Sequence, residues 1–286
     1  MATTVKEATD DAATDRAVDA TSDTVDKLAT EAGAVLQESA DAQGASATPV
    51  CLVIGAGDAT GSAIAKRFAG GGMIACVARR NGDKLAPLVA EIEAQGGRAI
   101  PFTCDARDEA QMVDMVTRIE REIGSVEVAV FNIGANVRFS ITETTTRVYT
   151  KVWEMCALGG FHTGREAARV MLPRGRGTIL FTGATASVRG GSGYAAFAGG
   201  KHALRALAQS MARELGPKGI HVAHVVIDGA IDTEFIRTQF PDRYALKKDG
   251  GILAPDSIAE QYWQIHRQSR DAWTFEMDLR PAMETW

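Results

Sequence analysis

The sequence predicts an α/β fold with a doubly wound, parallel, seven-stranded sheet of the Rossmann-like kind. Short apolar runs alternate with longer amphipathic segments from Pro49 onward, and a glycine-rich turn follows the first apolar run. Alternating strands and helices imply right-handed crossovers and therefore parallel strands. Several of the runs are apolar throughout, as strands covered by helices on both faces require. We therefore expect a single domain over residues 49–286.

The individual elements follow from the spacing of apolar residues along the chain. Strands are expected where five or six residues form a mainly apolar run, at 50–54, 73–77, 99–103, 126–131, 178–182, 222–227 and 274–279. Helices are expected between them, near 60–70, 83–95, 108–123, 148–172, 196–215 and 256–268. Residues 232–254, which contain a pair of glycines, are expected to form a mobile lid over the substrate.

Residues 1–48 have a composition unlike that of the rest of the chain. They contain ten acidic residues, three basic residues and no aromatic residue. A segment of this kind cannot bury enough apolar surface to fold alone. We expect an acidic N-terminal extension that is disordered or marginally helical.

Composition also narrows the class of protein. The chain has 286 residues and a net charge of −5, which disfavours nucleic acid as a partner. Its four cysteines include no C-x-x-C pair, so no metal site is expected. No run approaches the roughly 18 apolar residues of a membrane span, and the first residues lack the features of a secretory signal. We expect a cytoplasmic protein with no membrane partner.

A glycine-rich loop lies between the first predicted strand and the first predicted helix. Its residues are Gly55, Ala56, Gly57, Asp58, Ala59, Thr60 and Gly61. Glycines allow a tight turn, and they bring backbone N–H groups and a helix N-terminus close to a pyrophosphate. The placement of the loop favours a dinucleotide site over a helix-entry turn without a ligand.

Arg79 and Arg80 follow the second predicted strand, where a dinucleotide fold meets the adenosine ribose. A carboxylate at this place would bind the ribose 2′-hydroxyl, whereas arginine accommodates a 2′-phosphate. The pair therefore favours NADP(H) over NAD(H) as the cofactor. The alternative is a solvated basic pair at the end of a strand.

Five sequence motifs follow one another in chain order. They are Gly55-x-x-x-Ala59-x-Gly61, Cys104-Asp105-Ala106, Phe131-Asn132-Ile133-Gly134, Asp228-Gly229-Ala230-Ile231-Asp232-Thr233, and the helix from Gly199-Gly200-Lys201-His202-Ala203-Leu204 to Ala212-Arg213-Glu214-Leu215. On these motifs the chain from residue 50 onward resembles a short-chain dehydrogenase/reductase, although Ala59 replaces the family's middle glycine. The resemblance implies a nicotinamide dinucleotide cofactor and a small-molecule substrate. It also implies a homodimer or homotetramer, formed through the helices near 148–172 and 196–215.

The resemblance also implies cofactor-binding positions beyond the glycine loop. These are Asp105, Ala106, Asn132, Gly134, Lys201, Gly229, Ile231 and Thr233. In the family, the acid at Asp105 contacts adenine, the lysine at Lys201 holds the ribose, and the segment from Gly229 lies beside the nicotinamide amide.

Three of the family's four catalytic side chains are missing from this sequence. The family uses a Tyr that transfers the proton, a Ser that holds the substrate oxygen, an Asn that organises a water relay, and a Lys that lowers the pKa of the Tyr. The corresponding residues here are Phe197, Ala184, Cys156 and Lys201, so only the lysine remains. Because Phe and Ala side chains cannot donate a proton, we expect an altered active site.

Tyr194 is the alternative proton donor. It precedes Lys201 by seven residues, which is about 10 Å along a helix and too far for direct coupling. A three-residue insertion at the start of the helix would bring it into the active position. In the absence of that insertion, Tyr194 is expected at the wall of the pocket.

These observations favour an NADP(H)-dependent oxidoreductase with an altered active site. It would exchange hydride with a small carbonyl, alcohol, imine or activated alkene. One alternative is a non-catalytic NADP(H)-binding sensor or partner subunit, and another is lyase-like chemistry without a redox change. A change in nicotinamide absorbance during turnover distinguishes the first function from the other two.

Overall fold

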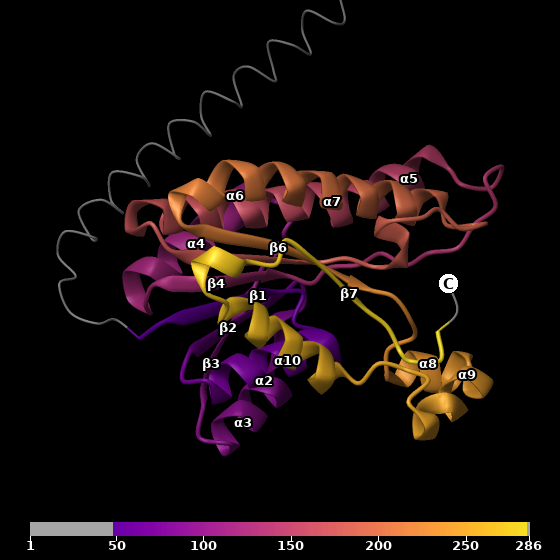
Figure 1. The fold of residues 1–286 in the computed structure, drawn as a ribbon, viewed down its shortest axis with the longest axis horizontal. Coiled ribbons are helices and arrows are strands. Elements are labelled where there is room, and N and C mark those ends of the chain that lie inside the picture. Colours follow the sequence, from indigo (N-terminus) through magenta and orange to yellow (C-terminus); the bar gives the residue numbers. More distant parts are fainter. Residues whose placement is uncertain (1–47, 285–286) are drawn as a thin grey trace, which may run out of the picture. The chain divides into compact units, whose positions relative to one another are not determined.

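Seven parallel strands form the sheet at the centre of this computed structural model, which describes residues 48–284 (Figure 1). The strands are β1 (Val50–Ile54), β2 (Ile74–Arg79), β3 (Arg98–Thr103), β4 (Val126–Phe131), β5 (Gly177–Thr182), β6 (Ile220–Ile227) and β7 (Glu276–Leu279). Their order in the sheet is β3-β2-β1-β4-β5-β6-β7, and all neighbours are parallel. The predicted doubly wound, seven-stranded sheet is therefore confirmed. The acidic extension, except Thr48, lies outside the described residues.

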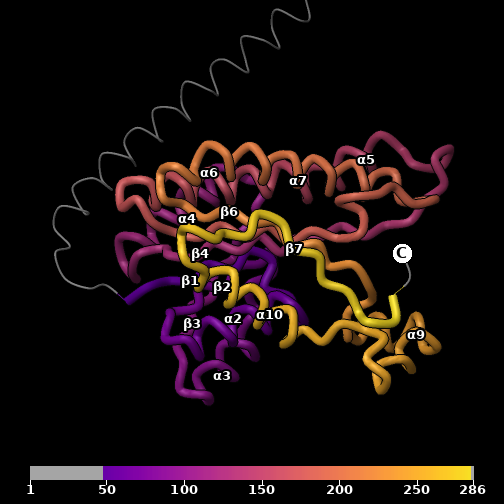
Figure 2. Tube along the Cα trace, viewed as in Figure 1, coloured from indigo at the N-terminus to yellow at the C-terminus, as the bar shows by residue number. Residues whose placement is uncertain are grey.

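Helices cover both faces of the sheet, as Figures 1 and 2 show. One layer contains α2 (Thr60–Gly70), α3 (Ala86–Ala94) and α10 (Pro255–His266). The other layer contains α4 (Glu109–Glu122), α5 (Thr146–Trp153), α6 (Gly159–Met171) and α7 (Ala195–Leu215). Two short helices, α8 (Glu234–Gln239) and α9 (Pro241–Ala245), follow β6 where a lid was expected. No helix within residues 48–284 is long and apolar enough to cross a membrane.

The core lies on both faces of the sheet. Phe68 of α2 is fully buried, and its ring packs edge-on against Trp263 of α10 with a centroid distance of 5.3 Å. On the other face, the buried rings of Phe131 and Phe181 lie against α6 at positions where that helix has glycines. Large apolar side chains fill the space between sheet and helices. The carboxyl ends of the strands are left as the edge at which a ligand binds in folds of this kind.

The predicted helix near 148–172 is the largest departure from expectation. The structure divides it into α5, a π-helical turn (Glu154–Leu158) and α6. At Gly160 a side chain would overlap Leu204 of α7, so the two helices approach closely there. The spacing of apolar residues indicates which face of a helix is buried, but it does not indicate a single π-helical turn within that helix. The expected helix near 83–95 likewise begins with a 3₁₀ turn (Gly82–Leu85) before α3.

Candidate cofactor and active site

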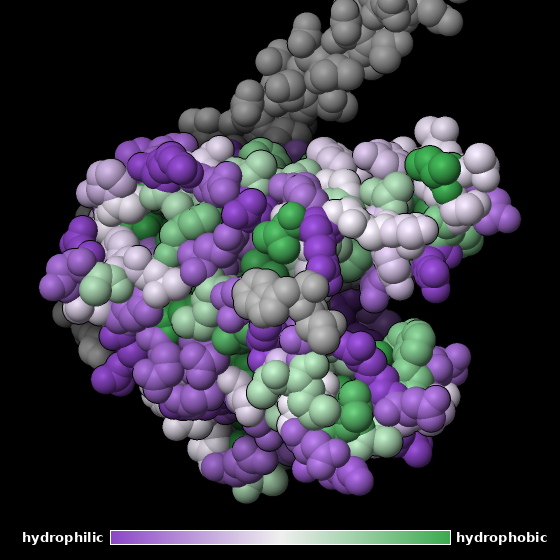
Figure 3. Space-filling view, turned by 45° about the vertical axis from the view of Figure 1, so that its right-hand side comes forward, coloured by the Kyte–Doolittle hydropathy of each residue, from purple (hydrophilic) through white to green (hydrophobic). Residues whose placement is uncertain are grey.

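Two cavities lie at the carboxyl edge of the sheet. The first has a volume of about 490 Å³ and lies between the glycine loop, the end of β2 and the end of β4. The second has a volume of about 470 Å³ and is lined by the end of β5, the start of α7 and the segment after β6. Asn132 lines both cavities, so they are neighbours. Figure 3 shows the surface hollowed between the region of α5 and the region of α8 and α9.

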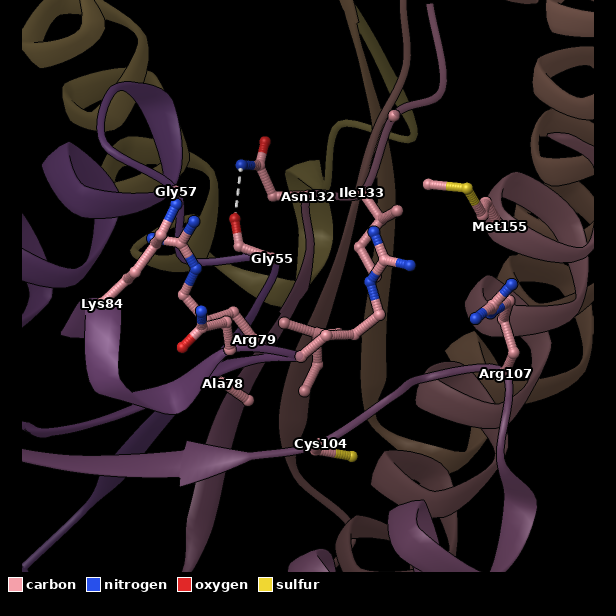
Figure 4. A pocket seen from close by; sticks show the side chains of 14 residues that line it. Gly55, Gly57, Ala78, Arg79, Lys84, Cys104, Arg107, Asn132, Ile133 and Met155 are labelled. Carbon is pink, nitrogen blue, oxygen red and sulfur yellow. Dashed lines mark hydrogen bonds between the residues drawn. The ribbon is translucent and has the colours of Figure 1, made fainter. Parts of the chain in front are cut away.

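The glycine loop closes tightly against the end of β4. Gly55 has a φ of +84°, and the Asn132 side-chain amide donates a hydrogen bond of 3.1 Å to the Gly55 carbonyl (Figure 4). A side chain on Gly61 would overlap the Gly55 carbonyl oxygen. The loop can follow this path because both positions are glycine. Of the predicted cofactor-binding residues, Gly55, Gly57, Asn132 and Gly134 line the first cavity, and Thr60 lines the second.

Other residues of the predicted loop do not line either cavity. The Asp58 carboxylate accepts a hydrogen bond of 3.1 Å from the Arg79 guanidinium, and its side chain is 89% exposed. Ala59 precedes α2, and Gly61 lies in its first turn. Asp58 therefore holds Arg79 against the loop, and Ala59 and Gly61 shape the backbone of the loop.

The first cavity is basic. Arg79, Arg80, Lys84 and Arg107 line it, and no carboxylate is among the described residues that do so. Figure 4 shows Lys84 and Arg107 on opposite sides of this cavity. Lys84, Arg107 and Asn81 also line this cavity and were not predicted from the sequence. Asn81 and Lys84 could have been found from the sequence, because they follow Arg79 and Arg80 closely in the chain and extend the polar, basic segment at the end of β2.

Asp105, which the family resemblance places at adenine, does not line the cavity. Its carboxylate accepts hydrogen bonds from the Arg107 guanidinium at 2.6 and 3.0 Å and from the Arg107 backbone N–H at 3.1 Å. The hydrogen bonds from Arg107 lower the pKa of Asp105. Ala106 is buried, and its carbonyl is hydrogen-bonded to His162. Arg107 therefore presents its guanidinium to the cavity, while Asp105 holds that guanidinium in place.

Lys201 is buried between the ends of β4 and β5 and is not among the residues that line either cavity. Its side chain is 2% exposed, and Nζ donates to the Ile133 carbonyl at 2.9 Å and to the Thr182 carbonyl at 2.8 Å. Burial lowers the pKa of this ammonium group. Two of its three hydrogens are thus directed at the ends of β4 and β5, which supply walls of the first and second cavity respectively.

The second cavity contains the positions of the missing catalytic groups. Ala184 and Phe197 both line it, and Phe197 lies one turn before Lys201 within the uninterrupted helix α7. Tyr194 also lines it, but as the residue that precedes α7, and its ring lies under the Arg138 guanidinium at 5.9 Å. Cys156 is fully buried against Gly200 and packs against Phe197 without lining either cavity, and burial raises the pKa of its thiol.

The far wall of the second cavity is fixed by a buried acid. The Thr185 hydroxyl donates to the Asp228 carboxylate, whose other oxygen lies 3.3 Å from the Arg280 guanidinium. Gly229 and Ile231 line the cavity next to this group. Thr233, predicted beside the nicotinamide, instead caps α8, because its hydroxyl accepts a hydrogen bond of 3.2 Å from the Ile236 backbone.

Comparison with known proteins agrees with this fold. A family profile described as short chain dehydrogenase matches residues 49–243. The chain belongs to the short-chain dehydrogenase family. Its members among the relatives are oxidoreductases, so this short-chain dehydrogenase is an oxidoreductase with a nucleotide-binding, Rossmann-like fold.

Individual relatives show the extent of the likeness. A crystal structure of a short-chain dehydrogenase from Rhodopseudomonas palustris is 50% identical, with a TM-score of 0.69 over 82% of this chain and 98% of that one. A short-chain dehydrogenase/reductase of Armillaria gallica is 30% identical over 60% of this chain and 67% of its own. A metagenomic short-chain oxidoreductase in complex with NADP is 22% identical and shares the fold, with a TM-score of 0.72 over 83% of this chain and 99% of its own.

A buried histidine supports the second cavity of this short-chain dehydrogenase. His224 of β6 is fully buried, and its Nδ1 lies 3.0 Å from the Glu276 carboxylate, which also binds Arg205. A side chain on Gly183 would lie 2.5 Å from the His224 ring, so Gly183 leaves room for it. Burial lowers the pKa of His224 to about 4. The imidazole is therefore neutral at neutral pH.

The free energy of unfolding is expected to fall as the pH is lowered from about 6.5 to about 4. In this window an unfolded His224 takes up a proton, whereas the folded one does not, because its pKa is lowered to about 4 by burial. The unfolded state therefore binds more protons, and a shift of this size is worth up to about 3 kcal/mol. Urea unfolding at a series of pH values measures the loss.

The variant His224→Gln should show a smaller loss of stability over the same window, and the exposed His202 provides the control His202→Gln. Some pH dependence should persist, because burial also lowers the pKa of His221 and His266. If the free energy of unfolding changed equally with pH in the wild type and in His224→Gln, the assignment of this pH dependence to His224 would be contradicted.

Proposed function

We propose that the protein is an NADP(H)-dependent oxidoreductase with an altered active site, which exchanges hydride with a small carbonyl, alcohol, imine or activated alkene. The observation that carries the proposal is the pair of neighbouring cavities joined at Asn132. The first has a basic end suited to a phosphorylated ribose, and the second has a largely apolar lining suited to a small substrate.

The residues of the first cavity fit NADP(H). Gly55 and Gly57 would face the pyrophosphate, and Arg79 and Arg80 would bind the 2′-phosphate as charge-assisted donors. The third hydrogen of Lys201 would reach the nicotinamide ribose. When bound, the cofactor supplies or accepts the hydride. The NADP complex of the metagenomic oxidoreductase of the same fold is consistent with this choice.

The substrate pocket offers little acid–base assistance at the reacting atom. Phe197 and Ala184 exclude water there but neither donate a proton nor stabilise an oxyanion. A positioned proton donor typically contributes 10²–10⁴-fold to the rate. A substrate that needs little proton transfer, such as an iminium ion or an activated alkene, therefore suits the pocket better than an ordinary ketone. Tyr194 remains the alternative donor from the cavity wall.

The loss of three catalytic groups favours a second candidate function, a non-catalytic NADP(H)-binding sensor or partner subunit. Calorimetric titration with NADPH, followed by absorbance of the reduced nicotinamide in the presence of ketones, enones and cyclic imines, tests both functions. Binding with turnover of any of these substrates supports the oxidoreductase. Binding without turnover supports the sensor, and absence of binding contradicts both.

A homodimer or homotetramer also belongs to this proposal. Tyr149 and Trp153 of α5 and Phe161 of α6 are large apolar side chains that are 40 to 45% exposed on one helical layer. Clusters of exposed aromatic residues favour association between subunits. Light scattering of the purified protein measures the number of subunits, and a monomer at micromolar concentration would contradict this part of the proposal.

NADPH is expected to bind more tightly than NADH, and the double variant Arg79→Ala, Arg80→Ala should reduce the difference. Because these are charge-assisted hydrogen bonds near solvent, we expect the preference for NADPH over NADH to fall by up to about 3 kcal/mol, or roughly a hundredfold in affinity. Calorimetry with both cofactors measures the preference. The matched control is Arg118→Ala, Arg121→Ala on α4, a pair that contacts Glu122 outside both cavities. Equal affinity of the wild type for NADPH and NADH would rule out the preference.

A further inference from the structure

The second cavity has one fully charged side chain in its lining. Arg189 is that residue, and the other residues that line the cavity are apolar, hydroxyl-bearing, amide or glycine residues. Arg189 is exposed, and the two glycines that follow it also line the cavity. The guanidinium therefore belongs to the solvent side of the pocket, on a segment whose backbone has few steric limits.

Arg189 differs from most arginines of the domain in its lack of a bound partner. Arg107, Arg174 and Arg205 each hold a carboxylate through two or more hydrogen bonds. Within residues 48–284, no hydrogen bond, ion pair or ring contact engages the Arg189 guanidinium. Its five N–H donors are thus available to a ligand in the cavity.

A second cation, Arg138, lies outside the lining of the cavity but next to it. Arg138 is exposed above the ring of Tyr194, and the next residue, Phe139, donates a backbone hydrogen bond of 2.9 Å to Gly193. The acid beside the cavity, Asp228, does not offset these charges, because the Thr185 hydroxyl and the Arg280 guanidinium already bind its carboxylate. The local potential therefore favours an anionic ligand.

We propose that the substrate of this cavity carries a carboxylate, which Arg189 binds while the reacting carbon lies near Ala184 and Phe197. The inference rests on the proposed function for its assignment of the cavity to the substrate. A planar guanidinium binds a carboxylate through two parallel hydrogen bonds, which a lysine cannot do. The cavity of about 470 Å³ is of the size that holds a small organic acid.

The test is a comparison of acids with their own methyl esters. The whole protein is titrated calorimetrically with benzoylformate and levulinate and with the methyl ester of each, both without cofactor and with saturating NADP⁺. Each acid should bind at least about tenfold more tightly than its ester, as expected for a charge-assisted contact. Arg189→Gln should abolish the advantage, and Arg189→Lys should retain part of it.

Arg147→Gln provides the matched control. Arg147 lies in α5, is exposed and likewise has no ion-pair partner within residues 48–284, but it does not line the cavity. This variant should retain the full preference for acids. Phenylphosphonate is included as a phosphate-like probe, and it should bind more weakly than benzoylformate.

Three results would overturn the proposal. They are an acid that binds no better than its ester, an unchanged preference in Arg189→Gln, and a phosphonate that binds ahead of the carboxylate. Failure of NADP⁺ to bind in the same titrations would contradict the proposed function instead. The comparison made without cofactor would still decide whether Arg189 selects a carboxylate.

Discussion

Phe197→Tyr combined with Ala184→Ser is expected to raise NADPH-dependent ketone reduction by up to about 10²–10⁴-fold. The structure places Phe197 one turn before Lys201 in α7, and Ala184 lines the same cavity. The new phenol would therefore lie beside the buried ammonium group of Lys201, and the new hydroxyl would lie within the substrate pocket. Substrate positioning limits the gain, because the pocket has not been shaped around these donors. Initial rates with a panel of ketones measure it.

Tyr194→Phe is the control for this prediction, and Phe197→Tyr alone separates the two added groups. If Tyr194→Phe removes a robust activity of the wild type, Tyr194 is the proton donor and the alignment of Phe197 with the family's tyrosine is wrong. If the double variant binds NADPH but reduces no ketone, the cavity is not a latent ketone site. That result favours the sensor function.

Gly61→Ala is expected to weaken NADPH binding by more than about a hundredfold and to destabilise the domain. A methyl group at this position would overlap the Gly55 carbonyl and lie 2.8 Å from the Ala56 Cα, so the glycine loop must move. These neighbours are backbone atoms, which cannot give way as a flexible side chain can, and such strain costs about 3 kcal/mol or more. Calorimetry with NADPH and thermal unfolding measure the two effects.

Gly70→Ala is the matched control at the other end of the same helix. Nothing lies within 4 Å of a methyl group at Gly70, and this residue ends α2 away from the loop. The variant should bind NADPH like the wild type and should be at least as stable, because alanine favours helix more than glycine does. If Gly61→Ala and Gly70→Ala lost NADPH affinity and stability to a similar extent, the close approach of the backbone at Gly61 would not be the cause of the loss.

The sheet could be predicted from the sequence because its strands are buried on both faces. The predicted ranges 50–54 and 126–131 match β1 and β4 residue for residue, and both strands are central in the sheet and apolar except at Glu127. The range predicted for the edge strand β7 began two residues early, because none of the four residues of this strand is fully buried and its apolar pattern is weak. The π-helical turn that holds Cys156 could not be foreseen, because it arises from packing of α6 on α7.

The backbone of the candidate site could be predicted from the sequence more fully than the positions of its charged side chains. The glycine loop and Asn132 carry local signals, and the structure brings them together through the hydrogen bond between Asn132 and Gly55. Arg107 was missed because its orientation depends on a carboxylate two residues earlier, and Lys84 was missed because it lies within a 3₁₀ turn rather than at the end of a strand. Asp105 was expected to face the cofactor, but a neighbouring guanidinium already occupies its carboxylate.

The residues after β7 have a practical consequence for anyone who produces this protein. Arg280 binds the acid that fixes the wall of the second cavity, and Glu284 pairs with Arg243 of α9. A shortened expression clone that stops at Leu279 would remove both contacts while leaving all seven strands in place. We expect such a protein to fold, with Asp228 in the wall of the second cavity left without its Arg280 partner. Changes at Arg280 and Glu284 therefore reach the second cavity and α9 without altering any strand of the sheet.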